Sequence, residues 1–260
     1  MKQRSALQIT WSVWQALFLR EALTRISSGR AAWFWLLAEP VLHIGYMVLI
    51  LVGLRMRSVG GIDAVVWVIV GMLGFFTFRR TGTQAGNGVN ANRSLFTYRQ
   101  VLPVDTILVR GVLEGFLMAL VTAVLLAAAA LLGHDVMADD PLAVLEASMA
   151  LWLFGMGFGL IVSVLGELVS EFNKLLSFVM MPVYLISGVM FPVSSMPLPL
   201  REWLMLNPVA HGLEAIRLGF APYYHAAPEL SLSYLYGAAL GSVFLGLALH
   251  RRFAMRLVTQ

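Results

Sequence analysis

Near the C-terminal end of the chain, residues 191–220 read FPVSSMPLPLREWLMLNPVAHGLEAIRLGF. The stretch is too apolar for a surface loop, yet proline and charged residues interrupt it too often for one membrane-crossing helix. Non-helical backbone at membrane depth occurs only where protein buries it or where it lines a water-filled cavity, because hydrocarbon offers no hydrogen-bond partners. Residues 192–220 therefore predict a re-entrant helical hairpin that lines a path through a membrane.

The whole chain has the composition of an integral membrane protein. Its 260 residues are 59% hydrophobic and 12% charged, against about 25% charged residues in a typical soluble domain, and the mean hydropathy is +0.81. The absence of cysteine excludes disulfides and thiolate metal sites, and we expect no metal site. The net charge of +4 comes from scattered residues, so we expect no nucleic-acid partner.

Six apolar stretches approach the roughly 20 helical residues that cross about 30 Å of hydrocarbon. Pro182 interrupts the fifth, and the second and fifth are short. We therefore predict an all-α membrane protein with a transmembrane domain over 31–256. The predicted spans are 31–54, 62–78, 106–132, 147–165, 175–191 and 232–249.

The distribution of lysine and arginine predicts the orientation. With the N-terminus in the cytoplasm, 14 of the 18 basic residues lie on that side, as the positive-inside rule requires. The outer connection between the third and fourth spans is acidic and has no lysine or arginine. Both termini are therefore expected in the cytoplasm, and the basic residues left outside are Arg55, Arg57, Arg201 and Arg217.

Residues 1–30 predict an amphipathic helix at the cytoplasmic interface. Trp11, Trp14 and Phe18 recur at helical spacing and form an apolar stripe. A cleavable signal peptide needs an uninterrupted apolar core, and Arg20 and Arg25 break this stretch. The helix is either a simple membrane anchor or a handle that also contacts a partner protein.

Between the second and third spans, residues 88–103 combine exposed aromatic and basic side chains on a cytoplasmic loop. Exposed aromatic residues are costly in water unless they dock against something. The segment therefore predicts a docking site for a cytoplasmic subunit, with the alternative that its aromatics settle beside their own bundle. The candidate coupling residues are Arg93, Phe96, Tyr98 and Arg99.

Charged and polar groups inside a span usually face a cavity or a partner. Glu39, His43 and Tyr46 form a polar stripe in the first span, and with Tyr184 of the fifth they are our channel or gate candidates. The alternative is a structural kink at Pro40 with a satisfied polar pair.

Two further charge groups lie near the inner ends of spans. Arg110 and Glu114 are four residues apart and predict a helix-stabilising pair. Glu167, Glu171 and Lys174 cluster between the fourth and fifth spans. There Glu171 either receives an arginine from a partner or belongs to a solvated turn.

Within the re-entrant segment, Asn207 is a candidate N-cap and Pro208 has the favoured first helical position. A helix from there places His211, Glu214 and Arg217 on one face. Glu214 and Arg217 either pair with each other or offer an outer-mouth contact to an acidic sugar or phosphate. The outer-mouth candidates are Arg201, His211, Glu214, Arg217, Tyr223 and Tyr224.

The chain resembles the membrane permease subunits of type-two ABC exporters, and is most similar to the capsular polysaccharide export (KpsM-like) branch. Three features carry the resemblance: the N-terminal interface helix, the sequence ANRSLFTYRQVLPVD at 91–105, and Asn207-Pro208 followed by Glu214 and Arg217. In such permeases two copies form a channel, and the loop between spans two and three inserts into a cleft on the ATPase.

The resemblance implies a homodimer with two ABC ATPase subunits in the bacterial inner membrane, exporting a polysaccharide with periplasmic and outer-membrane proteins. No G-x-x-x-x-G-K-[ST] loop occurs in the sequence, so ATP and magnesium are expected on the partner and this chain is expected to have neither cofactor nor catalytic residues. The same architecture moving another glycan, a lipid or a drug is the alternative. An ion-coupled carrier is disfavoured because only the C-terminal half has a broken segment, and an intramembrane serine protease because no G-x-S-G site is present.

Overall fold

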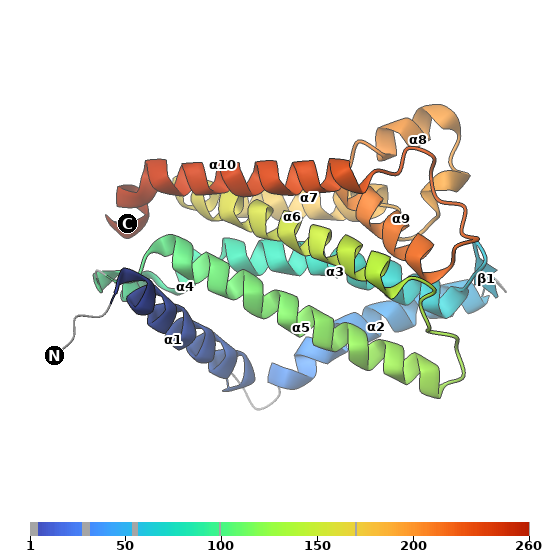
Figure 1. Ribbon diagram of the computed structural model, residues 1–260, viewed down its shortest axis with the longest axis horizontal. Helices are drawn as coiled ribbons and strands as arrows, with labels where there is room; N and C mark the ends of the chain where they lie inside the picture. Colours follow the sequence, from blue (N-terminus) through green and yellow to red (C-terminus); the bar gives the residue numbers. More distant parts are fainter. Residues whose placement is uncertain (1–4, 28–31, 54–56, 99, 170, 260) are drawn as a thin grey trace.

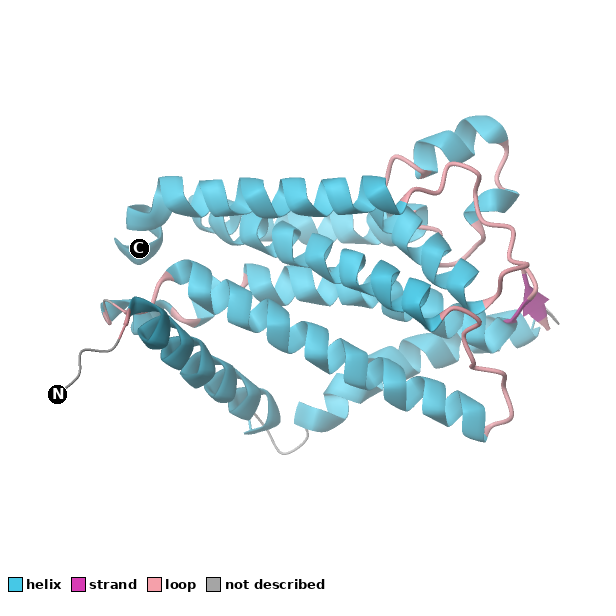
Figure 2. Ribbon diagram, viewed as in Figure 1, coloured by secondary structure: helices cyan, strands magenta, loops and turns pink. Residues whose placement is uncertain are grey.

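The computed structural model describes residues 5–27, 32–53, 57–98, 100–169 and 171–259. These residues are nearly all helical, and the long helices run side by side along the molecule (Figures 1 and 2). In the described part of the chain, four helices are long and apolar enough to cross a membrane. They are α3 (Ala64–Gly86), α5 (Pro103–Leu131), α6 (Pro141–Leu168) and α10 (Leu232–Thr259).

Shorter elements surround these helices. The remaining helices are α1 (Ala6–Ser27), α2 (Ala32–Gly53), α4 (Gly88–Ala91), α7 (Phe172–Ile186), α8 (Leu198–Leu204) and α9 (Pro208–Phe220), with 3-10 turns at Arg93–Thr97 and Val193–Ser195. Strand β1 (Ser58–Val59) pairs antiparallel with β2 (Ile62–Asp63). Gly60 and Gly61 form the hairpin turn at φ +59° and +93°, which glycine adopts without steric cost.

The all-helical membrane class that the sequence predicts is confirmed at this level. Each of the six predicted spans overlaps a helix, and α2 and α7 contribute the shorter apolar stretches Ala38–Ile50 and Phe172–Ile186. Pro40 and Pro182 lie inside α2 and α7 without ending either helix.

Three helices end five or more residues away from the predicted ends of their spans. Helix α3 continues through Arg79 and Arg80 to Gly86 and replaces the first part of the predicted loop. Helix α10 continues ten residues beyond 249, because arginine ends an apolar stretch without ending a helix. Helix α7 stops at Ile186, before Gly188 turns the chain at φ +72°.

Helix α3 is the centre of the bundle, with Trp67, Phe75 and Leu73 almost wholly buried. It crosses α6 at two glycine pairs, Gly82 with Gly86 and Gly155 with Gly159. An added Cβ on Gly155 would lie 2.6 Å from the carbonyl oxygen of Phe78. Two small residues four apart let helix backbones approach this closely.

Residues 191–220 fold at the end of the bundle where α3 and α6 begin (Figure 1). The predicted N-cap is confirmed, because the Asn207 side chain accepts a hydrogen bond from the Val209 backbone N–H and Pro208 begins α9. Helix α9 is buried against α3, α6 and α10, whereas α8 lies at the surface of this end.

Candidate functional site

The predicted coupling segment lies at the opposite end of the bundle, beside the C-terminal turns of α10 (Figure 1). Phe96 is only 8% exposed and belongs to a core cluster with Leu160 of α6 and Leu257 of α10. Its ring is therefore packed in the protein's own bundle rather than offered to a partner. Tyr98 is 66% exposed and remains free to contact another protein, whereas Arg99 lies outside the described residues.

Asn92 joins this segment to α1. The buried amide donates to Glu21 Oε1 at 3.2 Å and to the Gly88 carbonyl at 2.9 Å, and it accepts from the Arg20 guanidinium. Next to it, Arg93 forms an ion pair with the nearly buried Glu167 at the end of α6. The segment is thus held between the interface helix and the bundle.

Helix α1 packs along the first half of α5. The Trp14 indole donates to Asp105 Oδ1 at 2.8 Å, and Glu21 pairs with Arg110 Nε at 3.0 Å. Trp11 and Phe18 line a groove of about 590 Å³ between the two helices, and Trp11 is exposed. Of the three predicted interface residues, Trp14 is therefore the one that hydrogen-bonds the bundle.

A buried carboxylate extends these contacts to α2. Glu114 has no exposed surface, and its oxygens lie 2.9 Å from Arg80 Nε and 3.5 Å from Arg25 Nη2. Arg80 also pairs with Glu39 of α2 at 2.9 Å. The prediction of an Arg110–Glu114 pair is wrong, because each residue has a closer partner on another helix.

The gate candidates gather on one side of the bundle, on α2 and α7. The His43 ring contacts the edges of Phe76 and Tyr184, with centroids 5.6 and 5.8 Å apart. Tyr46 is exposed, and Glu39, His43 and Tyr46 line a hollow of about 650 Å³. The hydroxyl of Tyr184 is buried and has no hydrogen-bond partner among the described residues.

At the other end, Glu214 and Arg217 form an ion pair that is fully buried. Arg217 donates to the carbonyls of Gly188 and Val189 at 2.8 and 3.1 Å, and its guanidinium lies 3.8 Å from the centre of the Trp67 ring. Both groups face the protein interior, so the paired alternative describes this structure and a direct substrate contact does not.

Further contacts account for most of the other outer candidates. Glu214 accepts hydrogen bonds from the Tyr224 hydroxyl and the Ala227 backbone at 2.8 and 3.2 Å, and His211 lies against the Met205 carbonyl and the Ser231 N–H. Arg201 binds both oxygens of Glu229, and these bonds lower the pKa of that carboxyl. Tyr223 is 63% exposed and is available at the surface.

Several residues of this polar network could not be predicted from the sequence. Glu21 lies on α1, Arg80 on α3 and Asn92 between α4 and the 3-10 turn that follows it, so no spacing rule links them. One signal was present, because Glu21 is the single acidic residue of α1, which also contains Arg20 and Arg25. The acidic residues after the fourth span have different partners. Glu167 pairs with Arg93, and the exposed Glu171 pairs with Lys174 at 2.9 Å.

Comparison with known proteins supplies the family. Residues 12–221 match the family described as ABC-2 type transporter. The chain is 32% identical over 248 residues to the polysialic acid transport protein KpsM of Escherichia coli, covering 95% of this chain and 96% of that protein. It is also 31% identical to the capsule polysaccharide export inner-membrane protein CtrC of Neisseria meningitidis serogroup A, over 79% of this chain and 77% of that one.

A more distant relative is the capsule polysaccharide export inner-membrane protein BexB of Haemophilus influenzae, 27% identical over 96% of this chain and 94% of its own. The match to the family begins within α1, runs through residues 88–103 and ends just after α9. With its apolar helices and full-length similarity, the chain belongs to the ABC-2 type transporter family, as the multi-pass membrane permease subunit of an ABC exporter.

Proposed function

We propose that this protein forms the membrane channel of an ATP-driven exporter that moves a capsular polysaccharide across the bacterial inner membrane. The observation that carries the proposal is the similarity to polysaccharide transport proteins over nearly the full length of both chains. The segment 88–97, held by contacts to α1, α5, α6 and α10, supplies a rigid element on which an ATPase can act.

The proposed arrangement in the membrane has six spans, with α2 and α7 completing the set of α3, α5, α6 and α10. Helices α2 and α7 support this role because each combines apolar sequence with exposed apolar side chains such as Leu49 and Phe178. Residues 192–220 form the re-entrant segment on the outer side. Both termini and the coupling segment then face the cytoplasm.

A homodimer places the face of α2 and α7 against a second copy. That face carries Glu39, His43 and Tyr46 around an open hollow, next to exposed Leu42. A surface that combines polar and apolar side chains can contact the second copy through its apolar part and line a water-filled path with its polar part. The polysaccharide would move between the two copies.

Energy would come from two ABC ATPase subunits that hold ATP and magnesium. Their closure would press on the exposed part of the coupling segment, where Tyr98 lies, and the Asn92–Glu21 contact would carry α1 with it. The Glu114 network then connects α1 with α3 and α2, and so reaches the wall of the path. Periplasmic and outer-membrane proteins would take the polymer onward.

Reconstitution tests the proposal. The permease and its partner ATPase, inserted together in inside-out vesicles, should accumulate the host's capsular glycan when ATP is added and not when a non-hydrolysable analogue is added. Loss of accumulation in vesicles without the permease is the control. Vesicles that hydrolyse ATP and move a small drug or lipid, but no glycan, would refute the proposed substrate.

A further inference from the structure

Helices α5 and α6 touch on the side of the coupling segment and separate toward the other end of the bundle. The Trp152 indole of α6 donates to the Gly111 carbonyl of α5 at 2.9 Å, and an added Cβ on Gly115 would lie 2.4 Å from the same indole nitrogen. Farther along, α5 leans away from α6, and residues 132–140 connect the two helices (Figure 1). The space between them is a groove of about 700 Å³.

The side chains that line this groove leave a ligand no unengaged hydrogen-bond donor within the described chain. Three of them carry hydroxyls, and each hydroxyl donates to the carbonyl four residues earlier on its own helix; they are Thr77, Thr122 and Ser148. The indole N–H of Trp152 is engaged with α5, and the other lining side chains are apolar. A sugar would lose its water here without gaining partners, whereas a hydrocarbon chain would not.

The groove lies at membrane depth and opens to the lipid side. Between Gly115 and Leu126, both in its lining, α5 rises by eleven residues, or about 16 Å, which is half of the roughly 30 Å of hydrocarbon. Phe116 and Leu145 in the lining are 62% and 61% exposed. In Figure 1, α5 and α6 lie in front of α2 and α7, so this side is not the proposed contact face of the dimer.

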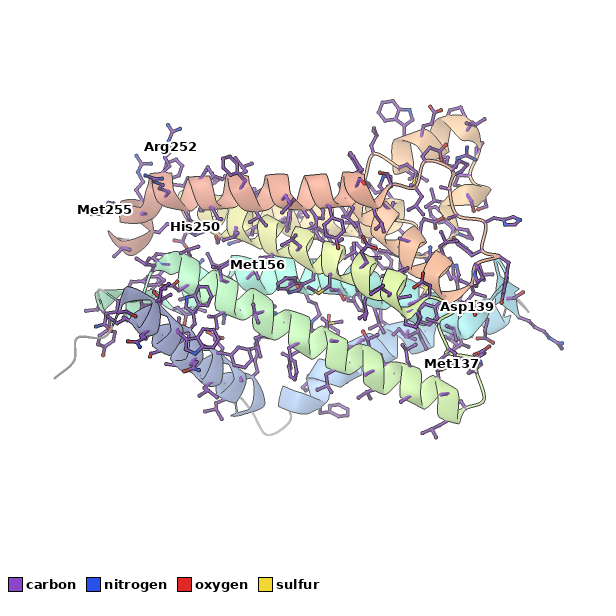
Figure 3. The ribbon with its side chains drawn as sticks, in the orientation of Figure 1. Met137, Asp139, Met156, His250, Arg252 and Met255 are labelled. Carbon is purple, nitrogen blue, oxygen red and sulfur yellow. The ribbon has the colours of Figure 1, made fainter. Side chains whose placement is uncertain are left out.

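The mouth of the groove is acidic. Met137 of the connection lines the groove, and the exposed Asp135 and Asp139 flank it in the sequence (Figure 3). Residues 111–173 contain no lysine or arginine, and nearby His134 is already paired with an aspartate of β2 at 3.1 Å. Such a mouth repels a lipid with a net negative charge and attracts an ammonium group.

We propose that the groove binds one acyl chain of a phosphatidylethanolamine-type lipid of the outer leaflet, with the lipid ammonium beside Asp135 and Asp139. The apolar lining and its depth select the chain, and the charge of the mouth selects the amine. The bound lipid fills the wedge between α5 and α6 and so holds α5, which also carries the contacts to α1, at its angle. This lipid belongs to the membrane and is not the transported polymer, so the inference goes beyond the proposed export and uses only its membrane arrangement.

Photo-crosslinking of the whole complex of permease and ATPase in nanodiscs tests the inference. The discs contain equal parts of phosphatidylethanolamine and phosphatidylglycerol and a trace of one probe, a lipid with a diazirine on its acyl chain and either an ethanolamine or a glycerol headgroup. In the wild type the ethanolamine probe should label the peptides of residues 115–126 and 144–152. It should do so about three- to fivefold above the glycerol probe, as an exposed ion pair contributes.

Two variants separate the headgroup from the chain. Asp135→Asn combined with Asp139→Asn should remove the preference for the ethanolamine probe, whereas Glu202→Gln, at an exposed acid of α8, should keep it. Ala119→Phe fills the groove from an exposed position and should lower labelling by the ethanolamine probe about threefold or more, because the ring excludes the chain. Its control is Ala128→Phe, at an exposed alanine half a turn around α5, which should be labelled as wild type.

Equal labelling of the groove by the two probes in the wild type overturns the inference, and this comparison needs no variant. Unchanged labelling in Ala119→Phe does the same, and so does a preference that survives the double aspartate variant. The absence of any lipid crosslink in the groove would mean another occupant, such as a helix of a partner protein, and overturns it as well. Vesicles that export no glycan although the probe labels the groove refute the proposed function alone, so the two failures are distinguishable.

Discussion

At the scale of single residues, burial decides what an arginine does in this protein. Arg217 and Arg79 both lie on helices beside apolar residues, and the sequence alone makes Arg217 the better candidate for a substrate contact. The structure argues against this, because Arg217 is enclosed with Glu214 and Trp67, whereas Arg79 is partly exposed. A buried charge stabilises a fold only while its partner is present.

Arg217→Met should therefore destabilise the protein strongly. It leaves the Glu214 carboxylate buried without its cation, which costs about 3–5 kcal/mol. Thermal unfolding of the purified complex in detergent should show a lowered midpoint, while Arg252→Met, at an exposed arginine, should not. An unchanged midpoint combined with lost export would restore Arg217 as a substrate contact.

At the scale of helices and segments, two kinds of contact join the elements. Glycine pairs bring α3 and α6 together in the middle of the bundle, and polar side chains join α1, the coupling segment and α5 at one end. At that same end His250 of α10 lies 2.8 Å from the Ser163 hydroxyl of α6 (Figure 3). The close contacts fix the bundle, and the polar ones can transmit movement because they link separate elements.

Gly155→Ala should loosen the α3–α6 crossing. The new methyl group would lie 2.6 Å from the Phe78 carbonyl oxygen, a backbone atom that cannot rotate away, and overpacking of this kind costs about 1–3 kcal/mol. The unfolding midpoint should fall. Gly237→Ala is the control, because an added Cβ there meets no atom within 4 Å, and equal midpoints for the two variants would contradict the close crossing.

Asn92→Asp should uncouple ATP hydrolysis from export. The change sets a carboxylate against Glu21 where the amide now donates a hydrogen bond, a loss of about 1–3 kcal/mol. In vesicles the ATPase rate should persist while export falls about tenfold.

The double variant Glu21→Gln with Asn92→Asp provides the matched test. It keeps the net charge of the wild type and reverses the direction of the hydrogen bond, so export should recover in part. A double variant no better than Asn92→Asp alone would show that this contact does not transmit the movement.

At the scale of the whole molecule, the two ends of the bundle differ in character. One end carries the coupling segment, the ion-pair network of α1 and the arginines of α10. The other end carries the β-hairpin, α8, α9 and the acidic α5–α6 connection with Asp139 (Figure 3). In the orientation that we propose, the first end faces the cytoplasm and the second faces outward.

Labelling can test that orientation directly, because the chain contains no cysteine. A membrane-impermeant maleimide should label Ser195→Cys in intact spheroplasts and Ser94→Cys only after the membrane is opened; both serines are exposed. Each variant is the control for the other. Labelling of Ser94→Cys from outside would contradict the proposed topology, because a cytoplasmic ATPase could not then reach the coupling segment.

The sequence by itself determined the membrane class, the approximate positions of six apolar helices and the cap of α9. These features follow from local properties, since apolar length, the placement of arginine and the pair Asn207-Pro208 act within a few residues. Tyr98 is exposed, as the sequence predicts, and its role in coupling stays a prediction.

Only the tertiary structure decided which polar residues are paired. Arg110 binds Glu21 rather than Glu114, and Phe96 packs beside Leu257. Arg217 is fully buried, whereas Arg79 is partly exposed. Each outcome depends on side chains far apart in sequence that meet because α1 packs on α5, α9 on α3 and α10 on α6. No local sequence pattern predicts these contacts, because a buried charge pairs with the group closest in space, which need not be the nearest one along the chain.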